Sequence, residues 1–555
     1  MLKTLVLIVC IFLFLTGCGK ISAYTSKNAV YDPAAKHVDR THFKNWGSSD
    51  VFVGVAISGG GSRSANFSAA VLEELESHGF MDHVSAISSV SGGSITAAYF
   101  ALHKDDLNWS EFYAKLRVDL EDRAWCRFLY CPWFSIANLF LGGFTHYDRS
   151  NLMAEVFDDV YFDNKTFGDL SSEGPKLLII ATSVTSPWIT TPFLDLNFRT
   201  NLYSRLDTFP ISQAVMASGA FPGVFHNVTL TNFDLHADSI EIADAHSLIH
   251  KMQTLSDSDR TRFFIQLPPN LDELSKLPSG SFLNNLLKGI LIDFIYKDRT
   301  SPHETKKSLE GWFGSTIKFV PTYEHLYDGG PSDNWGLNTI MGAAQAFSEA
   351  KRERWKGCFV FLIDATSESL ASDTRFEADT RQGLDYLVDS NLLEASDVLF
   401  NKSRLQMLTN LRKTEKGALH EGKLPQDETR SCMIWHIALV GLEESFGHKE
   451  GGLKKWSDTV PYAAKRIRTR YWLTGINGCS ARQHQEILRA AAGILINGDG
   501  EHEISKLPEA HEWFHEHALG LKSYPRKSIF DEGPTELIVE DKTGLPSIRC
   551  LSFRK

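Results

Sequence analysis

Ser91 lies in a stretch whose residue types suit a catalytic nucleophile. Ser89-Val90-Ser91-Gly92-Gly93 ends an apolar segment, Val84 to Val90, and precedes a helical pattern, Ser94 to Leu102. A sharp strand-to-helix turn can expose a serine hydroxyl at the amino end of a helix when small residues flank it two positions before and after. Gly93 supplies the second glycine of the G-x-S-x-G pattern, and Ser89 replaces the first. We therefore predict that Ser91 is a nucleophile for acyl transfer.

A glycine-rich loop, Ser58 to Ser64 (SGGGSRS), precedes this turn by one strand–helix unit. It follows the apolar run Val51 to Ile57 and opens a helical pattern that Gly79 ends. The N–H groups of Gly59, Gly60 and Gly61 are unobstructed by Cβ atoms and share the positive end of the helix dipole, so they can bind a phosphate or an oxyanion. G-x-x-x-x-G-K-[ST] is absent, and no G-x-G-x-x-G is followed by an acidic ribose ligand, which disfavours nucleotide binding.

Alternating strands and helices predict an α/β fold, a three-layer α/β/α sandwich with a mostly parallel central sheet. Residues about 230 to 320 contain several prolines and are interpreted as an insertion. After about residue 370 helical patterns dominate, so we expect a largely helical C-terminal region over 366–555, either the end of the same domain or a cap on it. Further predicted strands are Lys176 to Thr182, Cys358 to Asp364 and Met433 to Leu442, and further helices Tyr462 to Leu473 and Gln483 to Ile496.

Four blocks of the sequence resemble the patatin-like phospholipase family. They are the SGGGSR loop, the SVSGG turn, the Ala/Ser-rich segment Ala214 to Phe225 with its proline, and Asp328-Gly329-Gly330, in the family's order. The resemblance implies a catalytic domain over residues 49–365, with Ser91 as nucleophile and Asp328 as its partner in a Ser-Asp dyad. It also implies that Gly59, Gly60 and Gly61 form the oxyanion loop, with no cofactor and no catalytic histidine.

The activity implied by this resemblance is hydrolysis of lipid carboxylic esters, of the phospholipase A or lysophospholipase type. A membrane phospholipid or lysophospholipid would be the substrate. A general carboxylesterase or thioesterase on the same site, or a non-catalytic lipid-binding protein, are the alternatives.

Asp328 would accept a proton poorly at a pKa near 4 unless its surroundings are partly desolvated. A triad with His325 or His226 as base stays open, and Arg63 either steers a phosphate headgroup or ties down the loop.

His511-Glu512-Trp513-Phe514-His515 matches the metal motif H-E-x-x-H, with Glu536 as an imaginable third ligand. The motif is short and the chain has 20 histidines, so chance matches are expected. Pro508 and Gly520 also confine it to a short helix. We therefore expect a solvated or packed helix, and no metal in the reaction.

The first residues predict membrane attachment. Met1-Leu2-Lys3 is a basic start, and the apolar run Leu5 to Leu15 is too short to span a bilayer, as in a secretory signal. Leu15-Thr16-Gly17-Cys18 resembles the lipobox of bacterial lipoproteins, which implies a signal peptide over 1–17, acylation of Cys18 and a tether over 18–48. Gly19 favours the outer membrane over the inner one.

Composition bounds the remaining possibilities. The chain has 555 residues, 43% of them hydrophobic, enough for a large core. Its formal charge of −11, with basic residues scattered, argues against a nucleic-acid partner. No protein partner is predicted. Outside the cytoplasm disulfides are permitted, but spacing does not give their connectivity among Cys126, Cys131, Cys358, Cys432, Cys479 and Cys550.

Overall fold

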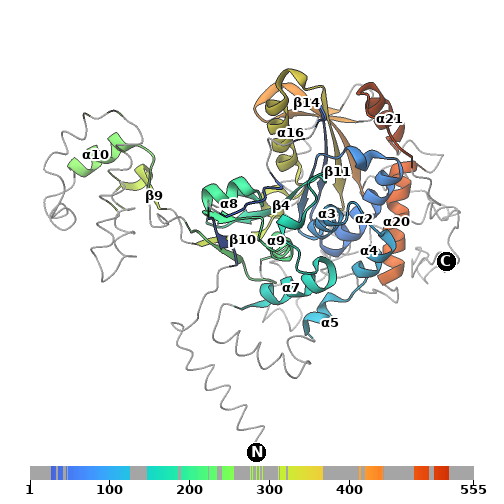
Figure 1. Ribbon diagram of the computed structural model, residues 1–555, viewed down its shortest axis with the longest axis horizontal. Helices are drawn as coiled ribbons and strands as arrows, with labels where there is room; N and C mark the ends of the chain where they lie inside the picture. The colour runs from blue at the N-terminus through green and yellow to red at the C-terminus, as the bar shows by residue number, and fades with distance from the viewer. Residues whose placement is uncertain are drawn as a thin grey trace, which may run out of the picture. The chain divides into compact units, whose positions relative to one another are not determined.

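The computed structural model (Figure 1) divides into two compact units. The first comprises residues 1–199, 205–229 and 325–555, and the second residues 200–204 and 230–324. The second unit spans nearly the same residues as the predicted insertion. The structure describes residues 27–32, 35–41, 46, 48–125, 147–185, 189–222, 224–233, 240–254, 276, 278, 283, 287, 291, 311, 313–319, 323–366, 412–413, 419–440, 442, 481–498 and 505–523.

The first unit is built on a mixed sheet with the strand order β12-β13-β14-β11-β2-β3-β4-β10-β7, in which β5 also pairs with β4. The five central strands, from β14 to β4, run parallel. Strands β5 and β10 run antiparallel to β4, and β13 runs antiparallel to its neighbours. The bounds are β2 (Val51–Ile57), β3 (Ala86–Val90), β4 (Lys176–Ser183), β5 (Ile189–Pro192), β7 (Val228–Thr231), β10 (Tyr323–Asp328), β11 (Gly357–Asp364), β12 (Arg412–Lys413), β13 (His420–Leu424) and β14 (Asp427–Ala438).

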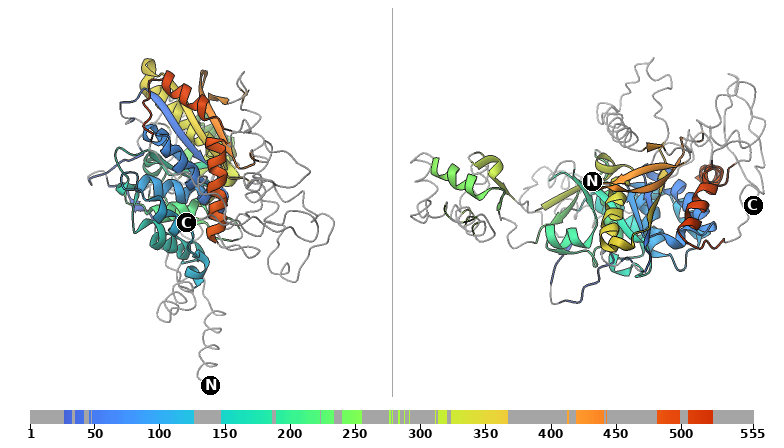
Figure 2. Two further views of the ribbon diagram at one scale, coloured as in Figure 1. Left: turned by 90° about the vertical axis from the view of Figure 1, so that its right-hand side faces the viewer. Right: turned by 90° about the horizontal axis from the view of Figure 1, so that it is seen from above.

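Helices cover both faces of this sheet (Figures 1 and 2). Helix α16 lies on one face, and α2, α3, α9 and α21 lie on the other, with α20 packed against α2. The helix bounds are α2 (Gly61–Ser77), η1 (Phe80–His83), α3 (Gly92–Leu102), α4 (Trp109–Leu116), α5 (Leu120–Trp125), α7 (Arg149–Phe157), η3 (Asp158–Phe162), η4 (Phe167–Asp169), α8 (Asp195–Asn201), α9 (Ile211–Ser218), α15 (Gly330–Asp333), α16 (Leu337–Lys351), η6 (Arg352–Arg354), α20 (Ala481–Asn497) and α21 (Leu507–Glu516).

Strand β2 shows why its sequence is an unbroken apolar run. All seven of its residues are buried, because successive side chains point to opposite faces and both faces are covered. On one face, a Cβ atom at Gly54 would lie 2.7 Å from Ile340 of α16. On the other, Ile57 Cγ2 would lie 2.6 Å from a Cβ atom at Gly93 of α3. The predicted three-layer α/β/α arrangement around a mostly parallel sheet is therefore confirmed.

The sequence predicted more of the strands at the centre of the sheet than of those at its edge. The predicted segments from residue 51 to 102, and those at 176–182 and 358–364, correspond to β2, α2, β3, α3, β4 and β11. The strand predicted at Met433 to Leu442 lies earlier, as β14, and pairs in parallel with β11. This part of the C-terminal region therefore belongs to the same domain. Helix α20 matches the helix predicted over Gln483 to Ile496, whereas Tyr462 to Leu473 lies outside the described residues.

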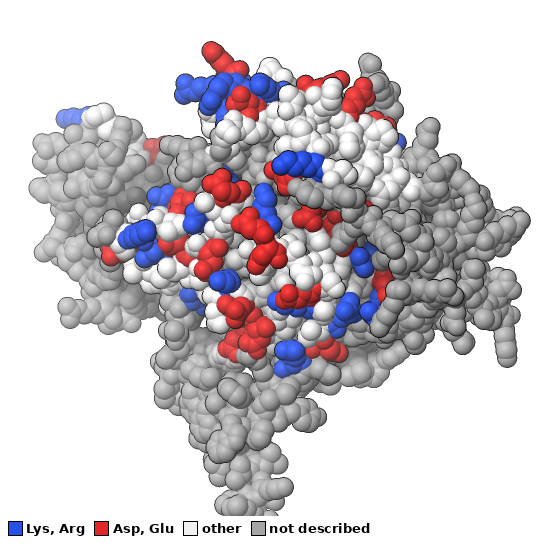
Figure 3. All heavy atoms as spheres, turned by 45° about the vertical axis from the view of Figure 1, so that its right-hand side comes forward, with Lys and Arg blue, Asp and Glu red and all other residues white. Residues whose placement is uncertain are grey.

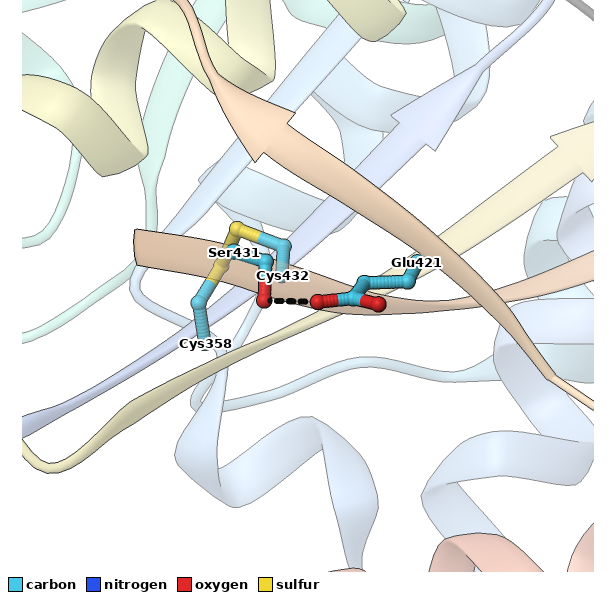
Figure 4. Close-up of a disulfide and its surroundings, with 4 residues drawn as sticks. All are labelled: Cys358, Glu421, Ser431 and Cys432. Carbon is cyan, nitrogen blue, oxygen red and sulfur yellow. Dashed lines mark hydrogen bonds between the residues drawn. A yellow bond between two sulfur atoms is a disulfide. The ribbon is translucent and has the colours of Figure 1, made fainter. Parts of the chain in front are cut away.

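A disulfide joins β11 to β14, at the amino end of the segment over which these two strands pair (Figure 4). Cys358 and Cys432 each precede a residue of the register pair Phe359 and Met433, so they are direct neighbours across the two strands. Both cysteines are buried, and the link spans 74 residues of sequence. Spacing alone did not predict this pairing. The other four candidate cysteines lie outside the described residues.

Part of the predicted tether is docked on the first unit. His37 Nε2 lies 2.7 Å from Asp195 Oδ1, and His37 Nδ1 lies 3.4 Å from Asp207 Oδ1. Thr41 Oγ1 accepts a hydrogen bond of 2.8 Å from the backbone N–H of Asp195. Strand β1 (Ala29–Val30) also pairs with β6 (Ser204–Arg205). The prediction of a tether through residue 48 is therefore wrong for residues 27–32 and 35–41, because His37 lies between two buried carboxylates that hold this polar segment in place.

The second unit contains a small two-stranded sheet, β8 (Ile240–Ile242) with β9 (Ile317–Phe319), together with α10 (Ala245–Thr254) and η5 (Gly314–Thr316). Lys251 Nζ of α10 donates a hydrogen bond of 2.6 Å to the carbonyl of Phe313.

Within the described residues of both units, no helix combines the length and apolar character needed to cross a bilayer. Acidic and basic side chains are interspersed over the described residues of the face drawn in Figure 3.

Candidate active site

Ser91 occupies a strained turn between β3 and α3. Its backbone has φ of 52° and ψ of −127°, a region that side chains other than glycine rarely occupy. Ser91 is half-buried, and α3 begins at the next residue. This is the geometry of a nucleophile elbow, in which the turn pushes the hydroxyl out at the amino end of a helix. The predicted turn at Ser91 is therefore present, although Ser89 replaces the leading glycine.

The elbow and the glycine loop approach too closely for side chains. A Cβ atom at Gly92 would lie 2.0 Å from the carbonyl oxygen of Gly61. One at Gly93 would lie 2.6 Å from the carbonyl oxygen of Ser58. Contacts this short are forbidden, so glycine is required at both positions for the loop after β2 to lie against the start of α3.

Asp328 reaches Ser91 because of the sheet register. In the parallel pair β3–β4, Val90 lies beside Ile180, and in the antiparallel pair β4–β10, Asp328 lies beside Ala181. Ser91 and Asp328 therefore stand at the same level on either side of β4. Ser91 Oγ donates a hydrogen bond of 2.9 Å to Asp328 Oδ2.

The carboxyl group of Asp328 is held in a dry environment. The residue is buried, with 4% of its surface exposed, and its Oδ1 accepts a hydrogen bond of 2.8 Å from the Gly330 N–H. Burial raises the pKa of Asp328 to about 6, although the hydrogen bonds from Gly330 and Ser91 favour the ionised form. A carboxylate with this pKa can accept a proton near neutral pH, as the role predicted for Asp328 requires.

Ser218, at the end of α9, holds the elbow in place. Its Oγ accepts a hydrogen bond of 2.8 Å from the Ser91 N–H and donates one of 2.6 Å to the carbonyl of Ile180 on β4. Since its single proton is used there, the 3.1 Å contact with Ser94 Oγ must be donated by Ser94. The Ser218 carbonyl also accepts a hydrogen bond of 3.1 Å from the Gly329 N–H. Sequence reasoning included Ser218 only as part of a small-residue helix and missed this role.

The three loop glycines are not equivalent. The Gly59 N–H donates a hydrogen bond of 2.9 Å to the carbonyl of Asn334, which removes it from the expected set of oxyanion donors. Within the described residues, the N–H groups of Gly60, Gly61 and Gly92 have no acceptor. They lie at the starts of α2 and α3, where the first N–H groups of a helix are unused. Gly92 follows the nucleophile directly, a position that supplies an oxyanion donor in elbows of this type.

Arg63 ties the loop to the sheet. Its side chain is buried, with 6% of the residue exposed, and its Nε donates a hydrogen bond of 2.7 Å to the carbonyl of Ala365, directly after β11. The sequence left two roles open for Arg63, steering a phosphate headgroup or fixing the loop. These contacts support the second role.

The two histidines considered as possible bases, His325 and His226, make their described contacts with residues other than Ser91. His325 Nδ1 lies 2.9 Å from Thr229 Oγ1, and the backbone carbonyl of His226 accepts a hydrogen bond from Ser150. The partner of Ser91 Oγ among the described residues is a carboxylate.

His511, Glu512 and His515 lie on α21, in the short helix expected from Pro508 and Gly520. The His511 ring packs edge-on against Phe80, with centroids 5.1 Å apart, and against His78. Burial, with the neighbouring His78 imidazole, lowers the pKa of His511. No group of three or more His, Cys, Asp or Glu side chains that could hold a metal ion occurs among the described residues. Glu536 lies outside them.

Residues 55–245 match the family model of the patatin-like phospholipases, which includes the glycine loop, Ser91 and Ser218. Residues 55–245, about a third of the chain, thus match a patatin-like phospholipase domain. This match supports hydrolysis of lipid esters as the class of activity. Asp328 lies beyond the matched residues, so its pairing with Ser91 rests on the geometry above.

Two solved structures show similarity to the patatin-like domain and its surroundings. Human GIVD cytosolic phospholipase A2 is 13% identical over 80% of this chain and 60% of its own, with a TM-score of 0.34. VipD from Legionella pneumophila is 11% identical over 66% of this chain and 79% of its own, with a TM-score of 0.21. The chain thus spans about three fifths of the human protein's length. A search among curated proteins finds no significant match.

Replacing Ser218 with alanine should destabilise the elbow. Ser218→Ala leaves the Ser91 N–H and the Ile180 carbonyl without their partner, which should cost about 2 kcal/mol of unfolding free energy. The reaction of Ser91 with a fluorophosphonate should also slow, because the turn loses its support. Urea unfolding and labelling rates measure the two effects. Ser68→Ala, a buried serine bonded within α2, is the matched control; equal labelling rates in both variants would contradict the role of Ser218.

Proposed function

We propose that the chain is a serine lipid acyl-hydrolase of the phospholipase A or lysophospholipase type, with Ser91 and Asp328 as a catalytic dyad. The observation that carries this proposal is the 2.9 Å hydrogen bond from the half-buried Ser91 hydroxyl to the buried Asp328 carboxylate. A serine hydroxyl is a weak nucleophile, and an adjacent base that takes its proton activates it.

The proposed reaction has two steps. Ser91 Oγ attacks the ester carbonyl carbon while its proton passes to Asp328, which then gives the proton to the leaving alcohol oxygen. Water attacks the acyl-enzyme, Asp328 takes a proton from that water, and the acid is released as the proton returns to Ser91. The N–H groups of Gly60, Gly61 and Gly92 would stabilise the oxyanion of both tetrahedral intermediates.

A phospholipid or lysophospholipid of the adjoining membrane is the proposed substrate. This proposal combines the family match of residues 55–245 with an N-terminal lipid anchor at Cys18, which we propose attaches the protein in the cell envelope, preferentially at the outer membrane. The Cys358–Cys432 disulfide supports a location outside the reducing cytoplasm.

The docked segment limits how far such an anchor could let the domain move. Eight residues, and therefore nine Cα–Cα steps, separate Cys18 from Lys27, the first residue of the described segment. Even fully extended, they would span about 30 Å. The proposed anchor would therefore keep the first unit close to the bilayer surface, where long-chain lipid esters are concentrated.

Replacing either member of the dyad should abolish hydrolysis of phospholipid vesicles. We expect Ser91→Ala to lower kcat by about 10⁴-fold or more, and Asp328→Asn by a similar order, as for other activated-serine hydrolases. Asparagine matches the volume of Asp328 and removes a buried charge, so this variant should stay folded. Released fatty acid is the measured quantity.

His325→Ala is the comparison variant for the dyad, because a Ser-His-Asp triad with His325 would lose activity with it. We expect this variant to keep wild-type activity. If activity survives both Ser91→Ala and Asp328→Asn, the dyad is wrong. A wild-type protein that hydrolyses no ester and is not labelled at Ser91 would favour lipid binding without catalysis.

The pH profile should follow the ionisation of Asp328. The carboxylate is the form that accepts the Ser91 proton, and burial raises its pKa to about 6. We therefore expect kcat/KM to reach a plateau above pH 7 and to fall about tenfold per pH unit below pH 6. The measurement is kcat/KM for a short-chain ester between pH 4.5 and 8.5. A plateau extending down to pH 4.5 would contradict Asp328 as the base.

Cys18→Ser tests the anchor separately from catalysis. The variant should lose incorporation of a labelled fatty acid and move from the membrane fraction to the soluble fraction. Its activity on a water-soluble ester should remain that of the wild type, since Ser91 and Asp328 are unchanged. Undiminished fatty acid incorporation would overturn the assignment of Cys18.

A further inference from the structure

Two separate supports hold the start of the glycine loop. The first is the end of β11. The Ile363 carbonyl accepts a hydrogen bond of 3.0 Å from the Ser58 N–H, and the Ala365 N–H donates one of 2.9 Å to Ser58 Oγ. The Ala365 carbonyl also receives the Arg63 hydrogen bond described above. The segment 363–365 therefore positions both the residue before the loop and the first turn of α2.

The conformation of this segment depends on a buried carboxylate between those contacts. Asp364 is fully buried, and its Oδ1 accepts a hydrogen bond of 2.9 Å from the Thr366 N–H. Its Oδ2 lies 3.2 Å from Nε2 of His436 on β14. A buried carboxylate that loses a partner must recruit another donor or move toward water, so this end of β11 would shift.

The second support is the Asn334 carbonyl, which accepts the hydrogen bond from the Gly59 N–H. The next residue, Trp335, is fully buried, and its ring packs against the ring of His436 with centroids 5.1 Å apart. The same histidine thus contacts Asp364, within the first support, through a hydrogen bond, and Trp335, the residue after the second support, through its ring.

We propose that His436 is a positioning residue for the oxyanion loop. It holds Ser58 and Gly59 through Asp364 and Trp335, which places the Gly60 and Gly61 N–H groups, without touching the substrate. This inference rests on the proposed acyl-hydrolase function and assigns a role to β14, which lies beyond residue 365. An oxyanion donor must be placed within a few tenths of an ångström, and a displacement of about 1 Å can cost about 10²-fold in rate.

The test compares His436→Ala with His436→Gln in the full chain. The glutamine amide can donate to Asp364 from the position of the imidazole Nε2, whereas alanine cannot. We expect His436→Ala to lower kcat for a short-chain ester 10- to 100-fold with KM within twofold, and His436→Gln to recover most of the loss. Amide exchange in the 51–64 peptide should accelerate in His436→Ala and return toward the wild-type rate in His436→Gln.

The double variant Cys358→Ser/Cys432→Ser is the control for general destabilisation, because it loosens the same two strands at the opposite end of their paired segment. It should unfold more easily and keep kcat. If His436→Ala does not fold, His436→Asn replaces it, since the shorter amide cannot reach Asp364. Wild-type kcat in the variant that lacks the hydrogen bond, or equal loss with glutamine, would overturn the proposal. An inactive wild-type enzyme would instead refute the proposed function, and the exchange rates would still test the role of His436.

Discussion

The close approach of two backbone segments is the constraint on which the site depends. Strands β2 and β3 run in parallel register, so the loops that leave their carboxyl ends emerge side by side. Since the Gly61 carbonyl lies where a Gly92 side chain would begin, the two loops can meet only as bare backbone. This contact brings unused N–H groups at the starts of two helices to the same place as the nucleophile. A side chain at Gly92 would separate Ser91 from its proposed oxyanion donors.

The second constraint is electrostatic. Asp328 lies at the end of an antiparallel strand, and its backbone N–H donates to the Ala220 carbonyl while its carboxylate receives the Gly330 and Ser91 hydrogen bonds. The hydrogen bonds from Gly330 and Ser91 hold the carboxylate in its buried position, and burial raises its pKa to about 6. Burial raises the free energy of the ionised Asp328 carboxylate, and for the same reason this carboxylate accepts a proton more readily. In the proposed dyad, one buried carboxylate would therefore perform the task that a histidine performs in many serine hydrolases.

The sequence predicted the features that depend on local patterns of residue type. The apolar runs of β2, β4 and β11 are continuous because these strands are covered on both faces, and the Ser91 turn is marked by its glycines. Strand β13 was missed because it contains no apolar run: exposed Glu421 and Lys423 alternate with buried Gly422 and Leu424. The docking of residues 27–41 was missed because one histidine and two distant aspartates, rather than hydrophobic periodicity, hold that segment.

Long-range hydrogen bonds account for what the sequence could not predict at the site. Residue type made the Gly59, Gly60 and Gly61 amides look alike, but only the fold shows that Gly59 is bonded to Asn334, far along the chain. Ser218 likewise supports Ser91 through a long-range contact, because its hydroxyl bridges the Ser91 N–H and the Ile180 carbonyl of β4. The groups that can carry the chemistry lie in recognisable motifs. The groups that orient them come from wherever the strand order places them, which is why β14 can influence a loop nearly 380 residues earlier in the sequence.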